Sequence, residues 1–231
     1  MAHAQQAEFV EIVKRHLPEF FAGGRVIEMG SLDINGSVRP HFQAQEHVGV
    51  DLAPGPGVDL VSMGHLVDLP SGSFDCAASL ECFEHNPYWL ETFLNMARLT
   101  RGGGLVLVTC ATTGRREHGT PRSAPESSPF TVARGWVHYR NLRERDFVDR
   151  LDLEEWFADW LFVTSHESYD LYFVGLRAGP GSPALPPAMI AELQHRFAPW
   201  RSARALKRFV KVALFGDFWS SPLTYYLRGK R

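Results

Sequence analysis

Short apolar runs alternate with helical patterns along the first half of this 231-residue chain, and few folds accommodate that order. The runs begin at residues 25, 47, 73 and 104 and read RVIEMG, HVGVDL, SFDCAASL and GLVLVTC, with a shorter VDLV at 58. Helical spacing precedes the first run over residues 4–21 and recurs from Pro87 toward the glycines at 102–104. Continuous apolar cores are typical of strands that are buried on both faces of a parallel sheet. The order therefore predicts an α/β fold with a Rossmann-like, doubly wound, mainly parallel sheet.

The second half departs from this alternation after Cys110. Residues 111–141 are polar, rich in Gly, Pro, Ser and Arg, and too long for a simple connector, so we predict an insertion that forms an active-site loop or lid. Helical patterns follow in LRERDFVDRL and DLEEWFADW. The runs LFVTSHES and DLYFVGLR then predict an antiparallel hairpin at the edge of the sheet. Together these segments predict one domain over residues 1–178.

Residues 179–231 are predicted to form a linker and a basic helical extension. The linker composition AGPGSPALPP precedes helical patterns over about 187–198 and 201–215. From Gly179 onward the chain has nine Lys/Arg residues and only two acidic residues, Glu192 and Asp217. The preceding part has 15 Lys/Arg and 24 Asp/Glu residues. The net charge of -2 therefore combines an acidic body with a basic tail.

Composition excludes several classes of protein. The N-terminus has no basic segment followed by an apolar core, and no run approaches the ~20 apolar residues of a membrane span, so the expected location is the cytoplasm. Three cysteines without a CxxC spacing do not make a disulfide framework.

The turn after the first strand carries the first chemical signal. VIEMGSLDINGS contains Glu28, Gly30 and Gly36, and Asp51 ends the second strand 21 residues after Gly30, close to the ~20 expected for an acid that binds a ribose. The turn lacks the GxGxxG of a pyrophosphate site, and no Gly-Lys-Ser/Thr follows a glycine-rich loop anywhere. Its acids therefore favour a cationic or uncharged ligand over a phosphate.

These segments, taken in order, resemble the class I S-adenosylmethionine-dependent methyltransferases over about residues 20–178. VIEMGSLDINGS resembles the first motif of that family and VGVDL the second. HLVDLPSGSFDCAASLECFEH resembles the adenine-binding turn, the fourth strand and its exit, and MARLTRGGGLVLVTC resembles the helix, glycine turn and fifth strand that follow. The resemblance implies S-adenosylmethionine as cofactor and methyl transfer as the activity.

The resemblance also implies cofactor contacts. Glu28 and Gly30 would approach the methionine end, Asp51 the ribose and Leu52 the adenine. Further contacts are implied for Ser31, Gly36 and Ser79. Many family members place an acid four residues before a Leu-Pro pair to bind the adenine amine. This chain has His65 there, so a backbone contact from Leu66 is the expected substitute.

The segment ECFEH, at the exit of the fourth strand, brings Glu81, Glu84 and His85 close to the expected methyl group. His85, with Glu81 beside it, could act as a general base on the acceptor. The trio could instead hold a divalent metal such as Mg²⁺, as a similar ExxEH pattern does in small-RNA 2'-O-methyltransferases and ubiquinone-pathway O-methyltransferases, with His118 or His138 of the insertion as further ligands. The third interpretation is that Glu84 and His85 only cap the following helix. All three remain open at this point, with His138 kept among the candidates for catalysis.

The expected acceptor is a small molecule methylated at oxygen or nitrogen. An RNA 2'-O-methyltransferase is the first alternative, but the acidic body makes nucleic acid an improbable partner. A non-catalytic, methyltransferase-like binding module is the second. In the tail, basic residues surround an apolar stripe that begins at Leu206. Such a helix docks on its own domain or on a second subunit in a homodimer, makes peripheral contact with an anionic membrane, or contacts nucleic acid.

Overall fold

Seven strands form one mixed sheet in the order β3-β2-β1-β4-β5-β7-β6. The computed structural model describes residues 4–217 of the chain. The strands are β1 (Arg25–Met29), β2 (Glu46–Asp51), β3 (Leu60–Val61), β4 (Phe74–Leu80), β5 (Thr100–Ala111), β6 (Phe157–Ser165) and β7 (Asp170–Arg177). β1 pairs in parallel with both β2 and β4, so the strand order reverses between β1 and β4. Such a switch point is where doubly wound sheets bind ligands.

The hairpin predicted at the sheet edge is confirmed. β7 lies between β5 and β6 and pairs antiparallel with each of them. The fold is therefore the Rossmann-like, mainly parallel α/β sheet with an antiparallel hairpin that the alternation of elements predicts.

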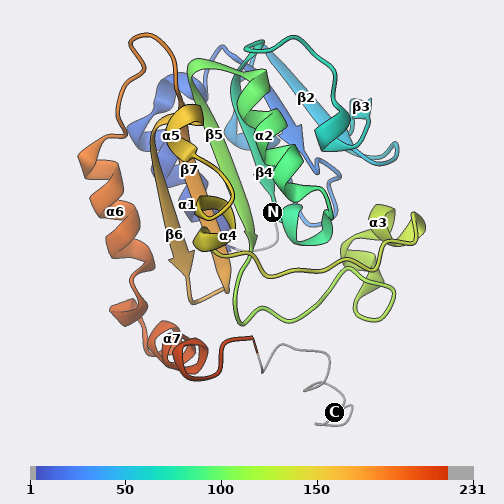
Figure 1. Ribbon diagram of the computed structural model, residues 1–231, viewed down its shortest axis with the longest axis vertical. Coiled ribbons are helices and arrows are strands. Elements are labelled where there is room, and N and C mark those ends of the chain that lie inside the picture. The colour runs from blue at the N-terminus through green and yellow to red at the C-terminus, as the bar shows by residue number, and fades with distance from the viewer. Residues whose placement is uncertain (1–3, 218–231) are drawn as a thin grey trace.

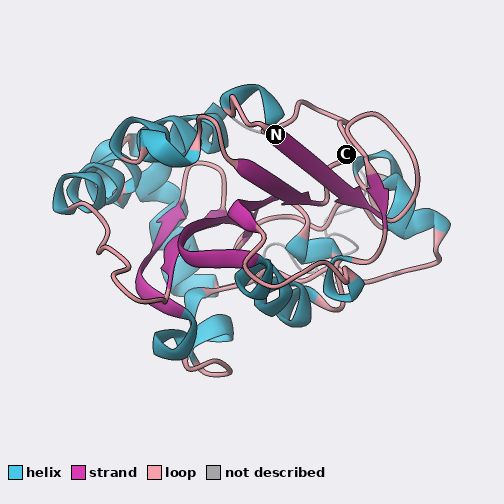
Figure 2. Ribbon diagram, turned by 90° about the horizontal axis from the view of Figure 1, so that it is seen from above, coloured by secondary structure: helices cyan, strands magenta, loops and turns pink. Residues whose placement is uncertain are grey.

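Helices cover both faces of the twisted sheet (Figure 1, Figure 2). The α-helices of the described residues are α1 (Ala4–His16), α2 (Trp89–Leu99), α3 (Pro129–Ala133), α4 (Glu144–Val148), α5 (Leu153–Trp156), α6 (Pro187–Phe197) and α7 (Ala203–Phe215), of which α3 belongs to the insertion and α7 lies beyond the end of the sheet. Along β5, Leu105 and Leu107 join one core cluster with residues of α1 and α6, while Val106 and Val108 join a second cluster with residues of α2, α4 and α5. This alternation explains the continuous apolar sequence of the strand, because both of its faces are buried.

Two local predictions are wrong. DLEEWFADW is not helical throughout: α5 ends at Trp156 and β6 begins at Phe157. Phe157 is buried against Phe93 and Phe173, so tertiary packing outweighs the local helical pattern. The glycines at 102–104 do not end a helix before the strand but lie within β5, where the pairing with β4 shifts register between Phe74 and Cys76.

α6 is part of the core of the sheet domain. Its residues Met189, Leu193 and Phe197 are buried in the cluster that includes Phe9 of α1 and Tyr172 of β7. The domain boundary placed at residue 178 stays a prediction, but the apolar face of this helix is shared with the sheet that precedes the boundary.

α7 contacts the body through only part of its surface. Ala205 is buried and the Phe209 ring packs on His166 at 5.1 Å between centroids, whereas Leu206, Val210 and Leu214 are exposed. None of the helices within residues 4–217 is both long and apolar enough to cross a membrane. Residues 218–231, the rest of the predicted extension, lie outside the described residues.

Candidate functional site

A cleft lies at the carboxyl ends of β1, β2 and β4, beside the switch point. Of the residues predicted to bind the cofactor, Gly30, Gly36, Asp51 and Leu52 line it. Its volume is about 940 Å³, counting the open solvent at its mouth. The insertion supplies the opposite wall with residues 127–131 and Trp136. Figure 1 shows the insertion leaving the end of β5 and reaching α3.

The turn after β1 brings backbone close to backbone. Gly30 has φ +79°, and a Cβ at this position would lie 2.5 Å from Cβ of Cys82. Glycine alone tolerates both the conformation and the approach. The backbone N–H groups of Gly30 and Ser31 both donate to the Val50 carbonyl oxygen, which fixes the turn to the end of β2. The Asp33 carboxylate accepts from Gly36 N–H at 2.9 Å and closes the lengthened part of the turn.

Asp51 ends β2 with its carboxylate held in place by two backbone groups. One oxygen accepts from Leu32 N–H at 3.0 Å and the other from Leu52 N–H at 2.7 Å. Burial raises the pKa of Asp51, and the two backbone hydrogen bonds partly oppose that shift. Each carboxylate oxygen has two lone pairs, so both oxygens keep the capacity to accept a further hydrogen bond from a ligand in the cleft.

Three predicted cofactor contacts lie on strands or turns but away from the cleft wall. Glu28 is buried, and its carboxylate lies 2.9 Å from Nε2 of His47 on β2. The Ser79 hydroxyl donates to the Met29 carbonyl oxygen at 2.8 Å. Ser31 is buried, and its hydroxyl has no hydrogen-bond partner. Their contacts with a cofactor stay predictions.

The turn after β3 places His65 and Leu66 away from the cleft wall, and their contacts with a cofactor stay predictions. His65 stacks on Tyr88 at 4.3 Å between ring centroids, and Leu66 is exposed with its N–H donated to the Met63 carbonyl oxygen. The cleft is lined here by Ser62, Met63 and Gly64 instead. The sequence pattern does not predict these three residues as part of the cleft, although they come directly after the predicted VDLV strand, where a ligand-binding loop is expected.

The exit of β4 carries a strained acidic residue. Glu81 lines the cleft and has φ +56°, a left-handed conformation that costs on the order of 1–3 kcal/mol outside glycine. Its carboxylate lies 3.8 Å from the Arg115 guanidinium. Burial, followed by the nearby charge of Asp170, raises the pKa of Glu81 well above its usual range.

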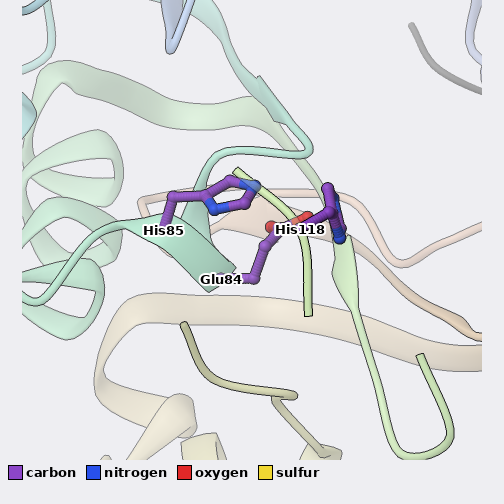
Figure 3. A group of neighbouring side chains, drawn as sticks. All are labelled: Glu84, His85 and His118. Atoms are coloured by element: carbon purple, nitrogen blue, oxygen red, sulfur yellow. The ribbon is translucent and has the colours of Figure 1, made fainter. Parts of the chain in front are cut away.

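Glu84 and His85 follow in a short turn of 3-10 helix and meet His118 of the insertion. One potential ligand atom from each of these three residues lies within 4.8 Å of the other two. Figure 3 shows the Glu84 side chain pointing toward His118 with His85 beside it. The sequence pattern predicts Glu81, Glu84 and His85 as the ligands of a possible metal. In the described part of the chain, the side chains close enough to share an ion are Glu84, His85 and His118, without Glu81. His138 is partly buried, with an unpartnered Nε2, and is not a member of this group.

The protonation states of the trio follow from burial. Burial lowers the pKa of His85 to about 3, with a further contribution from His118, and it raises the pKa of Glu84 to about 7. His85 is therefore neutral at physiological pH. A general base works best with a pKa near the operating pH, so this environment disfavours His85 in that role.

The comparisons with known proteins agree with the fold. A family profile described as "Methyltransferase domain" matches residues 1–163. Phosphoethanolamine N-methyltransferase 2 of Haemonchus contortus, solved with S-adenosyl-L-methionine, is 16% identical to this chain, with a TM-score of 0.53. The match covers 75% of this chain and 53% of that one, so this chain spans about half of that protein. The 1,6-didemethyltoxoflavin-N1-methyltransferase of Burkholderia thailandensis, solved with its substrate and S-adenosylhomocysteine, is 16% identical with a TM-score of 0.53, covering 76% and 79% of the two chains. A search of curated proteins finds no match.

Proposed function

Because the chain belongs to the methyltransferase domain family, we propose that it transfers the methyl group of S-adenosylmethionine to an oxygen or nitrogen atom of a small-molecule acceptor. The observation that carries this proposal is the position of Asp51 and Gly30 on one wall of the cleft at the switch point. The sulfonium of the cofactor supplies an activated methyl group, so the protein has mainly to bind and align the two reactants.

Different residues of the cleft contact different parts of the cofactor. The Asp51 carboxylate accepts hydrogen bonds from the ribose hydroxyls, and Leu52 packs on the adenine. The methionine end lies against the Gly30 turn, which lines the cleft and whose conformation and close packing on Cys82 require glycine. Glu81 and His85 line the same cleft and face the acceptor. Phe130 and Trp136 of the insertion close it, which supports a small acceptor enclosed between β4 and the insertion.

The first test measures S-adenosylhomocysteine binding by calorimetry. Asp51→Ala is expected to weaken binding by at least about 100-fold, since a hydrogen bond to a charged group contributes about 1.5–3 kcal/mol and Asp51 accepts from two hydroxyls. Asp68→Ala, which removes an exposed carboxylate outside the cleft, is the matched control and should bind normally. Thermal melting of each variant checks that it is folded.

Three results would redirect or refute parts of the proposal. Failure of the unmodified protein to bind either form of the cofactor would favour the non-catalytic binding module. Methylation of RNA that requires a divalent metal would favour the RNA methyltransferase. Asp51→Ala with undiminished affinity would refute the assignment of the ribose site.

A further inference from the structure

We propose that Asp217, which follows α7, is a positioning residue for methyl transfer: it joins the two ends of the insertion and thereby keeps Arg115 beside Glu81 in the cleft. The junction itself stands on the hydrogen bonds of Asp217. Its role in methyl transfer rests on the function proposed above.

A single carboxylate oxygen of Asp217 accepts hydrogen bonds from both ends of the insertion. Its Oδ1 accepts from Gly114 N–H at 3.0 Å and from the Asn141 side-chain amide at 2.9 Å. Gly114 lies where the insertion leaves β5, and Asn141 is the last residue of the insertion. The Asn141 amide also donates to the Arg115 carbonyl oxygen at 3.0 Å, so the two ends contact each other directly. The segment that follows α7 therefore lies against both ends at once (Figure 1).

Close packing around Gly114 keeps α7 next to the start of the insertion. Gly114 has φ +98°, and a Cβ at this position would lie 2.7 Å from the Tyr169 ring and 3.0 Å from Cγ2 of Val212 on α7. Glycine alone permits this conformation and this approach. The Arg208 guanidinium of α7 lies 4.6 Å from the centroid of the same Tyr169 ring. Three segments far apart in the sequence thus meet here: the insertion, the turn between β6 and β7, and α7.

Helix capping does not account for the place of the Asp217 carboxylate. α7 ends at Phe215, and a carboxylate just beyond the C-terminal end of a helix meets the negative end of the helix dipole. Hydrogen bonds from two N–H groups to a charged oxygen offset that cost. Both donors belong to the insertion, so the position of this carboxylate serves the tertiary contact.

Arg115 connects the junction to the cleft. Its backbone carbonyl accepts from Asn141, while its side chain is only 16% exposed and forms an ion pair with the buried Asp170 at 3.3 Å. The same guanidinium lies 3.8 Å from the carboxylate of Glu81, which lines the cleft with φ +56°. A shift of the first end of the insertion would therefore move the cation that faces Glu81.

The second end of the insertion is fixed beside the exit of β4. Arg140 N–H donates to the Glu84 carbonyl oxygen at 2.9 Å. Between the two ends, Phe130 and Trp136 form part of the cleft wall. A loop that is held at both ends loses less conformational freedom when a ligand binds, so the junction favours a preformed wall.

The test measures amide hydrogen exchange by mass spectrometry in the full-length protein without ligand. In Asp217→Ala, we expect residues 112–142 to exchange at least about tenfold faster, because two hydrogen bonds to a charged oxygen are lost. Asp217→Asn keeps an acceptor oxygen and should restore most of the protection. Asp149→Ala, which removes an exposed carboxylate at the end of α4, is the matched control. Unchanged exchange in β1 and β4 checks that each variant is folded.

Slow exchange of the insertion in Asp217→Ala, or equally fast exchange in Asp217→Asn, would overturn the positioning role. Asn141→Ala removes one donor of the junction and should also accelerate exchange. Combined with Asp217→Ala, its effect should be smaller than the product of the two single effects, because the two variants remove the same hydrogen bond. Independent effects would contradict the junction.

S-adenosylhomocysteine binding separates this inference from the proposed function. Since the insertion and Glu81 line the cleft, Asp217→Ala should weaken binding about 2- to 30-fold, whereas Asp217→Asn should bind nearly normally. Normal affinity in Asp217→Ala despite fast exchange would overturn the link from the junction to the cleft. If the unmodified protein does not bind this ligand, the methyltransferase proposal fails, and the exchange result alone decides whether Asp217 holds the insertion.

Discussion

Asp51 combines a partly buried carboxylate with two fixed backbone donors at the end of β2. The backbone bonds from Leu32 and Leu52 orient both oxygens before any ligand arrives, so little ordering remains for binding. Burial raises its pKa, since the charged form loses solvation in the cleft. We therefore expect cofactor binding to respond to the protonation state of Asp51, the residue that we assign to the ribose.

Cofactor affinity should consequently depend on pH. The ribose hydroxyls donate to the charged carboxylate, so binding is strongest above the pKa of Asp51 and weakens as the pH falls through it. Because that pKa is raised, the loss should begin above the range of an ordinary aspartate, whose pKa is about 3.9. Calorimetry with S-adenosylhomocysteine between about pH 4.5 and 7 measures this. Asp51→Asn, which cannot titrate, should remove the dependence; the same pH profile in both proteins would contradict the assignment.

At the scale of elements, α6 links the C-terminal segment to the sheet. Leu193 is fully buried in the cluster shared with α1 and β7, and Arg196 forms an ion pair with Glu8 of α1. A helix with such contacts stabilises the domain that it covers. We therefore expect residues 1–178 to depend on α6 for stability, whatever boundary describes the chain best.

Leu193→Ala should lower the free energy of unfolding by about 2–5 kcal/mol, the usual cost of emptying a buried leucine site. Gln194→Ala, next to it on the exposed side, should change that free energy by no more than about 0.5 kcal/mol. Chemical denaturation of both variants makes the comparison. Equal stability of the two would indicate that α6 belongs to an independent extension.

The whole molecule has an acidic body and a basic tail from Gly179 onward, and the tail includes the helix α7. The exposed side of α7 presents Leu206, Val210 and Leu214 together with Arg204 and Lys207. Ala205 and Arg208 hold the other side, the latter by a hydrogen bond to the Glu167 carbonyl oxygen. An apolar stripe bordered by cations complements an anionic lipid surface. A peripheral membrane contact, like a homodimer, stays a prediction from the tail.

Full-length protein should sediment with vesicles rich in phosphatidylglycerol, and salt should weaken the binding because part of the attraction is electrostatic. The double variant Leu206→Ser, Val210→Ser should lose most of the binding. Val61→Ser, which removes an exposed apolar side chain on β3, should retain it. Absence of vesicle binding together with a concentration-dependent dimer would assign the stripe to a second copy of the chain.

Local patterns predict the sheet, and they place Gly30, Gly36, Asp51 and Leu52, which line the cleft that we assign to the cofactor. An apolar run indicates a buried strand directly. The spacing from Gly30 to Asp51 predicts the ligand-binding turn, because the first strand, its glycine turn and the end of the second strand follow one another along the chain. The resemblance predicts that Glu28, Ser79 and His65 contact the cofactor, and these contacts stay predictions. In the fold the three side chains contact His47, Met29 and Tyr88, neighbours that no local pattern identifies.

The sequence by itself therefore determined the α/β architecture and the place of the cofactor turn, because burial periodicity and turn chemistry are local properties. Only the tertiary structure decided that His118, rather than Glu81, groups with Glu84 and His85, and that β6 begins at Phe157. It also decided that α7 leaves its apolar stripe exposed. These outcomes depend on contacts between segments far apart in the chain, where the packing of the whole fold outweighs the preference of any single stretch.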